Sequence, residues 1–267
     1  MAITTLDGVI AGLGKPNSFG KIGAGTQVAG RWYSPFYVGG ISGAAAAPTP
    51  GVAGAALTTY AGQLPFTNPG SGNSYLARLT AMSTQTGRLR ICDRLWHNSG
   101  LSVTTPTAQT VTSAAFPARD RNGAISGADV YIGVEVSTVM GSGAGNYSLS
   151  SYTNSAGGTG RVGGTVAYAS TMPVGTFTEL PLAAGDVGVG AISSFTASVS
   201  QTTGAYSLVA YRVLADIDLP LANVGYALDA IATGFPRLYD NTVPFLLWCN
   251  SGTTAPNLSG MYSIAQG

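Results

Sequence analysis

His97 is the only histidine of the chain, so any chemistry that needs an imidazole depends on this one residue. Zinc sites usually combine several histidine, cysteine or carboxylate ligands, and a Ser-His-Asp site needs a serine and a carboxylate beside the histidine, in some folds with the serine in a Gly-x-Ser-x-Gly turn. The sequence contains no Gly-x-Ser-x-Gly motif, and Cys92 and Cys249 match no metal or redox spacing. Because His97 follows Trp96 at the end of an alternating stretch, we interpret it as a packing residue.

Carboxylates are the next candidates, because two that lie close together can hydrolyse a glycosidic bond. The formal candidates are Glu135, Glu179, Asp216 and Asp218. Asp216 and Asp218 would point to the same side of a strand, but Pro220 follows closely, and we interpret them as solvated charges at a strand end. The glycine-rich stretches lack the Lys-Ser/Thr of a phosphate loop. We therefore expect no enzyme activity, no cofactor and no metal.

Arginines are the remaining polar candidates, and they form two groups: Arg88, Arg90 and Arg94, then Arg119 and Arg121. The first three share one face of a predicted strand, and the other two flank Asp120. In a chain with few charges, such residues can fix the geometry between subunits through bidentate pairing with acidic groups. Pairing within the fold, to Asp93 or Asp129, is the equally weighted alternative.

The elements that must position these residues are mostly strands, because hydrophobic residues recur with period two from Ser74 onward. The clearest strand is 130–137, in which Val130, Ile132, Val134 and Val136 face one way and the strand is half-buried. The other predicted strands are 75–82, 88–96, 109–116, 147–153, 165–169, 176–182, 195–199, 206–214, 244–249 and 260–265. Many short strands without long helices predict an all-β antiparallel β-sandwich of the jelly-roll kind.

Residues 1–73 are expected to form a separate part, an N-terminal helix and an extended arm, ahead of a β-sandwich domain at 74–267. Leu6, Val9, Ile10 and Leu13 have helical spacing after a Thr cap, and we expect this short helix to pack on the body or on a partner. The Gly/Ala/Pro-rich segment 39–74 is predicted to be an extended excursion. Small helices are expected within 52–63 and at 224–232.

Composition excludes several classes of protein. Charged residues make up 9% of the 267 residues, against roughly 25% in an ordinary soluble domain, and the net charge is +1. The basic residues are too sparse for direct binding of nucleic acid. Apolar stretches are too short to span a membrane, and no secretory signal is expected at the start.

Three stretches carry a resemblance to a known group of proteins: Thr5–Leu13, Ile91–Gly100 leading into Thr104–Thr110, and Arg237–Trp248. They resemble accessory structural proteins encoded in the head gene clusters of tailed bacteriophages, and the similarity runs from end to end. The resemblance implies a capsid cement or decoration protein that is made in the host cytoplasm and located on the capsid surface of the virion. It also implies a jelly-roll β-sandwich, the major capsid protein as partner and self-association as a homotrimer.

A capsid contact would use the N-terminal helix, the 39–74 arm and the two arginine groups. The candidate interface residues are Leu6, Val9, Ile10, Leu13, Arg88, Arg90, Arg94, Arg119 and Arg121. The alternatives are a tail or baseplate component, and a carbohydrate-binding β-sandwich that uses exposed aromatic residues.

Overall fold

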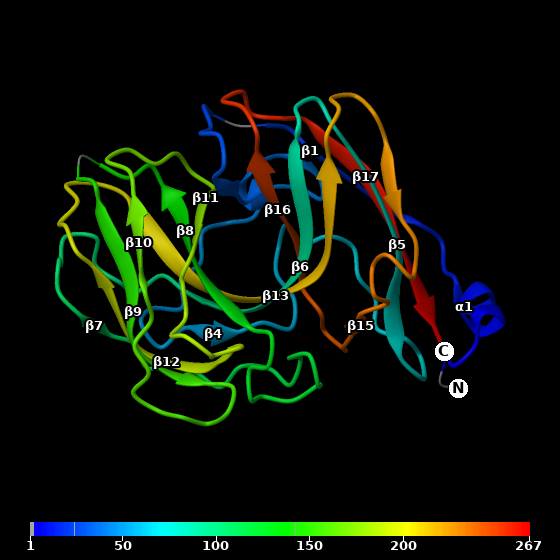
Figure 1. Cartoon of the computed structure of the whole chain (residues 1–267), viewed down its shortest axis with the longest axis horizontal. Coiled ribbons are helices and arrows are strands. Elements are labelled where there is room, and N and C mark those ends of the chain that lie inside the picture. Colours follow the sequence, from blue (N-terminus) through cyan, green and yellow to red (C-terminus); the bar gives the residue numbers. More distant parts are fainter. Residues whose placement is uncertain (1–2, 24, 142) are drawn as a thin grey trace. The chain divides into compact units, whose positions relative to one another are not determined.

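The computed structural model describes residues 3–23, 25–141 and 143–267. These residues form antiparallel strands, the short helix α1 (Leu6–Gly12) and the 3-10 turn η1 (Pro35–Tyr37) (Figure 1). The all-β class that the alternating pattern predicted is therefore confirmed.

The chain divides into two compact units, and each unit is assembled from separate stretches. Unit 1 contains the chain up to Ala45, Thr59–Asp93 and Val213–Gly267, and unit 2 contains Ala46–Thr58 and Arg94–Arg212. The expected boundary between residues 73 and 74 does not coincide with this division. The unit boundaries after Asp93 and Arg212 fall within two long strands, β6 (Gly87–Asn98) and β13 (Ala205–Leu219).

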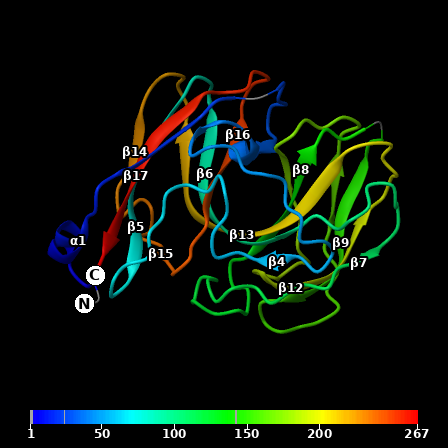
Figure 2. The same cartoon turned by 180° about the vertical axis from the view of Figure 1, so that it is seen from behind.

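Unit 1 contains a six-stranded sheet and a second set of paired strands. The sheet has the order β14 (Tyr226–Leu228), β5 (Ser74–Ser83), β17 (Leu258–Gln266), β1 (Asn17–Lys21) and β3 (Gly40–Ile41), and β15 (Arg237–Leu238) also pairs with β5. In the second set, β16 (Pro244–Asn250) pairs with β2 (Trp32–Tyr33) and with the first half of β6. Their inward side chains, including Leu79, Trp248 and Tyr262, share one apolar core. Figure 2 shows β17 beside β5 from behind.

Unit 2 has its own core. One sheet has the order β10 (Thr165–Tyr168), β9 (Gly145–Asn154), β12 (Val189–Ala197) and β7 (Gln109–Thr110). In the same unit, β8 (Tyr131–Thr138) pairs with β11 (Thr176–Glu179) and with the first half of β13, and β4 (Ala55–Ala56) pairs with β6. Tyr147, Phe195 and Tyr206 are part of the core. Antiparallel sheets are thus established, whereas a single jelly-roll sandwich is not confirmed.

The alternating pattern at 130–137 predicted a strand with one exposed face, and the structure differs from this prediction at strand β8. Val130, Ile132, Val134 and Val136 share the core as predicted, but the strand is not half-buried, because the opposite face is covered too. Glu135 on that face is fully buried, and a Cβ on Gly133 would lie 2.1 Å from the ring of Phe177. A small residue is therefore needed at position 133.

The segment 39–74 is not a free arm, because it packs on its own chain. Leu57 and Leu64 are buried, and their backbone N–H groups donate to the carbonyls of Leu95 and Pro244. The ammonium group of Lys21 donates to three backbone carbonyls between residues 38 and 43. The extended backbone was predicted correctly, but its partner is this protein itself.

The two small helices predicted within 52–63 and at 224–232 are wrong. The first range contains turns and strand β4, and the second contains strand β14 followed by a turn. Alanine-rich composition favours helices, but in both ranges pairing with a neighbouring strand takes precedence.

Candidate functional site

Helix α1 is formed where the sequence predicted it. The hydroxyl of Thr5 accepts a hydrogen bond from the backbone N–H of Gly8 at 3.1 Å, which is the geometry of an N-cap. Asp7 lies in the first turn, where a negative charge interacts favourably with the helix dipole. After the helix, the N–H of Gly14 donates to the carbonyl of Ile264, so α1 is tied to β17.

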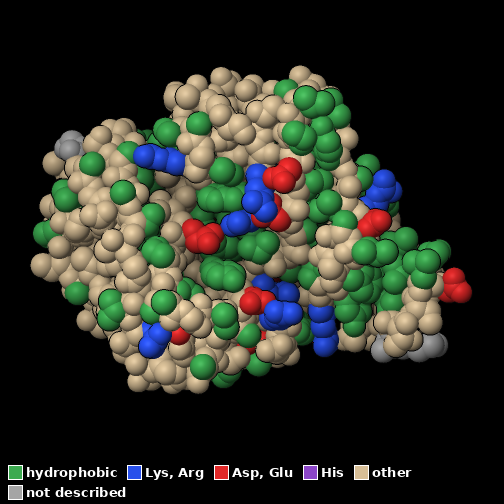
Figure 3. Space-filling view, viewed as in Figure 1, with side chains coloured by type: hydrophobic (Ala, Val, Ile, Leu, Met, Phe, Trp, Pro, Cys, Tyr) green, Lys and Arg blue, Asp and Glu red, His purple; other side chains and the backbone are tan. Residues whose placement is uncertain are grey.

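The orientation of α1 is unusual for a helix on a protein surface, because its aliphatic side faces solvent. Leu6, Ile10 and Leu13 are 71%, 60% and 46% exposed, and Val9 is partly exposed. The side toward the body is made by glycine: a Cβ on Gly12 would lie 2.6 Å from the carbonyl oxygen of Gln266 in β17. We call Leu6, Val9 and Ile10 of α1, together with the C-cap residue Leu13, the α1 face. Figure 3 shows hydrophobic side chains gathered over α1.

The first arginine group forms an ion-pair cluster in unit 1. The Nε atoms of Arg88 and Arg90 lie 2.5 Å and 2.8 Å from the two carboxylate oxygens of Asp216, which they share. The guanidinium of Arg90 also stacks on the ring of Trp32 at 4.1 Å. Figure 3 shows the basic and acidic side chains beside one another over β6 and β13. These contacts fix both arginines.

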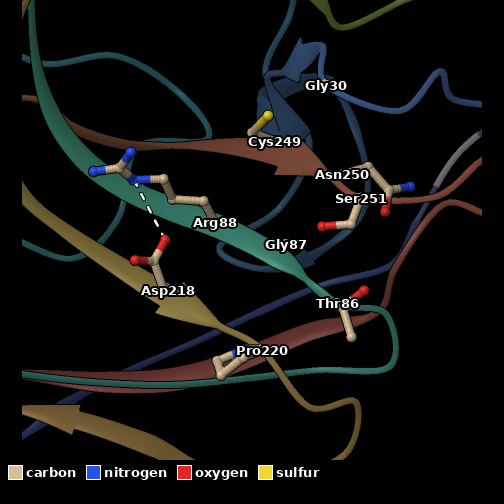
Figure 4. A pocket seen from close by; sticks show the side chains of 9 residues that line it. All are labelled: Gly30, Thr86, Gly87, Arg88, Asp218, Pro220, Cys249, Asn250 and Ser251. Carbon is tan, nitrogen blue, oxygen red and sulfur yellow. Dashed lines mark ion pairs between the residues drawn. The ribbon is translucent and has the colours of Figure 1, made fainter.

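An open groove of about 540 Å³ adjoins this cluster in unit 1. Its lining is Gly30, Thr86, Gly87, Arg88, Asp218, Pro220, Cys249, Asn250 and Ser251 (Figure 4). The side chains of Arg88 and Asp218 are 50% and 77% exposed, and the Nε of Arg88 lies 3.6 Å from the carboxylate. Burial raises the pKa of the Cys249 thiol despite the nearby arginines, so this thiol is not activated. Although Arg88 and Asp218 belong to its lining, most of the exposed lining surface of the groove is apolar.

The sequence missed this cluster, although a signal was present. Arg88 and Arg90 alternate on one strand, and Asp216 and Asp218 alternate on another, so complementary charges repeat with the same period. The predicted partners for these arginines were Asp93 and Asp129, and only the tertiary structure brings residues 88 and 216 together.

Arg94 and Arg119 are corrections to the predicted interface, because both are buried. The Nη2 of Arg94 lies 2.6 Å from Glu135, and both side chains are 0% exposed. Arg119 donates to the carbonyls of Leu57 and Arg94. Both residues therefore stabilise unit 2, and neither can contact another subunit in this structure.

Asp120 and Arg121 complete the second group. Asp120 accepts hydrogen bonds from the hydroxyl of Ser126 and from four backbone N–H groups, so it organises its own loop. Burial opposes its ionisation, but these hydrogen bonds dominate and lower its pKa. Arg121 is exposed and pairs with Asp129, as the alternative of pairing within the fold predicted.

His97 is buried in unit 2, where its Nδ1 accepts a hydrogen bond from the Nε of Arg94 at 3.3 Å. Burial, together with the Arg94 charge, lowers the pKa of His97 to about 3. A neutral, enclosed imidazole fits a packing residue.

Each of the four carboxylates considered for hydrolysis has a partner in the structure, and Asp216 and Asp218 both contact Arg88. Glu135 pairs with Arg94, Glu179 accepts a hydrogen bond from the hydroxyl of Tyr211 at 2.7 Å, and Asp216 holds the two arginines. Among the described residues, no three His, Cys, Asp or Glu side chains are grouped to hold a metal ion. No helix of the described chain has the length and apolar character to cross a membrane.

Comparison with known proteins found no matching family model, no matching curated protein and no matching solved structure. The α1 face, the Arg88–Asp216 cluster and the adjoining groove are therefore interpreted from their own geometry.

Proposed function

We propose that this chain is a virion structural protein, a capsid cement or decoration protein that binds the outer capsid shell and stabilises contacts between capsomers. The observation that carries the proposal is the outward orientation of the α1 face. The resemblance of three sequence stretches to phage head accessory proteins supports the same function, with the major capsid protein as partner.

Burial of the α1 face against a partner would contribute enough free energy to change the binding affinity measurably. Burying a Leu or Ile side chain contributes about 1.5–3 kcal/mol, and the exposed fractions of Leu6, Ile10 and Leu13 together approach two whole side chains. Their burial would contribute about 3–5 kcal/mol, which corresponds to roughly a hundredfold to several thousandfold in affinity. A protein that binds only the assembled shell stabilises that state by mass action.

The test compares binding to purified heads that lack this chain. We expect the wild type to bind and to raise the temperature at which the heads release DNA. The double variant Leu6→Ser/Ile10→Ser should bind at least tenfold more weakly. Ile231→Ser is the matched control, because Ile231 is 91% exposed and lies outside α1. Absence of the chain from virions by mass spectrometry would refute the proposal.

A carbohydrate-binding function is the alternative that a specific observation favours. The groove places the donors of Arg88, the carboxylate of Asp218 and the hydroxyls of Thr86 and Ser251 around an open space. Neighbouring sugar hydroxyls both donate and accept hydrogen bonds, so this neutral combination suits them. Glycan-array binding that Arg88→Ala and Asp218→Ala abolish would favour this alternative.

A further inference from the structure

We infer that the groove in unit 1 is a binding site for a small ligand that carries a carboxylate, and that the guanidinium of Arg88 binds this carboxylate. The groove has a volume of about 540 Å³, which is within the usual range for small-molecule sites. The inference does not depend on the proposed capsid function, because that function rests on the α1 face and not on this groove.

The first argument is that Arg88 is held in place by one edge of its guanidinium. Its Nε donates to a carboxylate oxygen of Asp216 at 2.5 Å, and Asp216 is fixed from its other side by the Nε of Arg90 at 2.8 Å. Among the described residues, no acceptor is hydrogen-bonded to the terminal nitrogens Nη1 and Nη2 of Arg88. These two nitrogens point away from Asp218 in Figure 4. A guanidinium held in this way can bind a carboxylate through two parallel hydrogen bonds.

The second argument is that the charge of Arg88 is only partly balanced within the chain. Its closest carboxylate, that of Asp216, is shared with Arg90. The other carboxylate, that of Asp218, lies 3.6 Å from the Nε and is 77% exposed, so water screens much of its charge. Burial raises the pKa of Cys249, so the thiol beside Arg88 adds no negative charge. An anionic ligand would complete the pairing of Arg88.

The third argument is that the walls of the groove are fixed before a ligand binds. The N–H of Gly30 donates to the carbonyl of Asn250 at 2.8 Å, and the N–H of Ser251 donates to the carbonyl of Thr86 at 3.1 Å. These bonds join three of the stretches that line the groove, so a ligand does not have to order them. Most of the exposed lining surface is apolar, and a charge-assisted hydrogen bond is stronger in such surroundings than in bulk water.

Asp218 indicates which group the ligand carries beside its carboxylate. Asp218 and Arg88 line the same groove, and an ionised carboxylate accepts hydrogen bonds but donates none. The ligand therefore needs an O–H or N–H donor close to its own carboxylate. A sugar acid supplies a hydroxyl group, and an α-amino acid supplies an ammonium group. Both sources share the carboxylate that Arg88 binds.

The experiment is a saturation-transfer NMR titration of small ligands with the full-length chain. The probes are D-glucuronate, N-acetylneuraminate and L-alanine, and D-glucose is the control that lacks a carboxylate. We expect at least one of the three acids to bind with saturation at millimolar concentration, and glucose to give no saturable signal.

Variants connect this binding to Arg88. Arg88→Met should weaken binding of the acid at least tenfold, because the carboxylate loses two charge-assisted hydrogen bonds. Arg88→Lys keeps the charge without the planar fork and should recover only part of the affinity. Arg78→Met is the matched control, because Arg78 is an exposed arginine of unit 1 that does not line the groove. Its affinity should equal that of the wild type.

Asp218→Asn distinguishes the two sources of the carboxylate. The variant should weaken binding of an amino acid, because the ammonium group loses its ionic partner. It should not weaken binding of a sugar acid, because the amide oxygen still accepts a hydrogen bond from a hydroxyl.

Three results would overturn the inference. The first is that none of the three acids gives a saturable signal, and the second is that glucose binds as tightly as the acids, which would favour the neutral carbohydrate alternative. The third is that Arg88→Met binds the acid as tightly as Arg78→Met. None of these results bears on the capsid function, which the binding to purified heads tests separately.

Discussion

Replacing Arg94 with methionine should destabilise unit 2 severely, because the change leaves Glu135 without the charge that faces it. The two side chains are fully buried and their ionic atoms lie 2.6 Å apart. Removing one partner of a buried ion pair typically costs about 3–5 kcal/mol, since the remaining charge stays desolvated. A loss of this size lowers the folding equilibrium constant by a factor of roughly one hundred to several thousand.

The assay is urea unfolding, followed by circular dichroism and by hydrogen exchange of peptides from β6 and β8. Arg121→Met is the matched control, because Arg121 pairs with Asp129 at 3.2 Å but its side chain is 72% exposed. An exposed pair contributes about 0–1 kcal/mol. The double variant Arg94→Met/Glu135→Leu removes both charges and should recover most of the lost stability.

Two results would refute this reasoning. One is a loss for Arg94→Met no larger than that for Arg121→Met, which would mean that water reaches the pair. The other is a double variant no more stable than Arg94→Met, which would mean that the packing of the arginine side chain, and not its charge, stabilises unit 2.

Three further predictions concern α1 and two buried titratable groups. Gly12→Val should displace α1 from β17, because the added Cβ would lie 2.6 Å from a backbone oxygen. Limited proteolysis should then cleave the N-terminus at least tenfold faster. The control variant Gly225→Ala should leave the cleavage rate unchanged, because no atom lies within 4 Å of the added Cβ. Burial lowers the pKa of Lys21 from 10.5 to about 8. Between these two pH values the unfolded chain binds more protons than the folded chain, so the free energy of unfolding should rise as the pH increases from 8 to 10. A Lys21→Met variant whose free energy of unfolding rises with pH as steeply as that of the wild type would contradict this prediction. Burial lowers the pKa of His97 from 6.5 to about 3. Between pH 3 and pH 6.5 the unfolded chain therefore binds more protons than the folded chain, so the free energy of unfolding should fall as the pH drops from 6.5 towards 3. An NMR titration in which this imidazole protonates near pH 6 in the folded protein would disprove the prediction.

Local sequence was sufficient for elements whose partners did not need to be known. The Thr5 cap and the spacing of Leu6 and Ile10 predicted α1, and alternation predicted strands such as β5, β9, β16 and β17 within a few residues. Both signals arise from local backbone geometry and side-chain periodicity. The helix predicted at 224–232 failed because pairing of Tyr226 with Ala81, far away in the chain, outweighs local propensity.

The candidate interface was predicted only in part for the same reason. Leu6, Ile10 and Leu13 were proposed as contact residues and are exposed. Arg94 was predicted to be an interface residue like Arg88, because the two alternate on the same strand. The structure instead buries Arg94 against Glu135, which lies on another strand. Alternation assigns a residue to a face of a sheet, but it does not tell whether another layer covers that face.

The amino-acid sequence by itself determined that this is a β-rich chain of low charge with a capped N-terminal helix, because those properties depend on composition and on neighbours within a few positions. The tertiary structure alone decided that the chain forms two compact units, each built from separate stretches of the sequence, that the 39–74 segment packs on its own chain and that α1 turns its aliphatic side outward. These features depend on contacts between residues distant in the chain, such as Gly12 with Gln266 and Leu64 with Pro244. Such contacts form only when the free energy gained by burying apolar side chains exceeds the entropy cost of closing long loops.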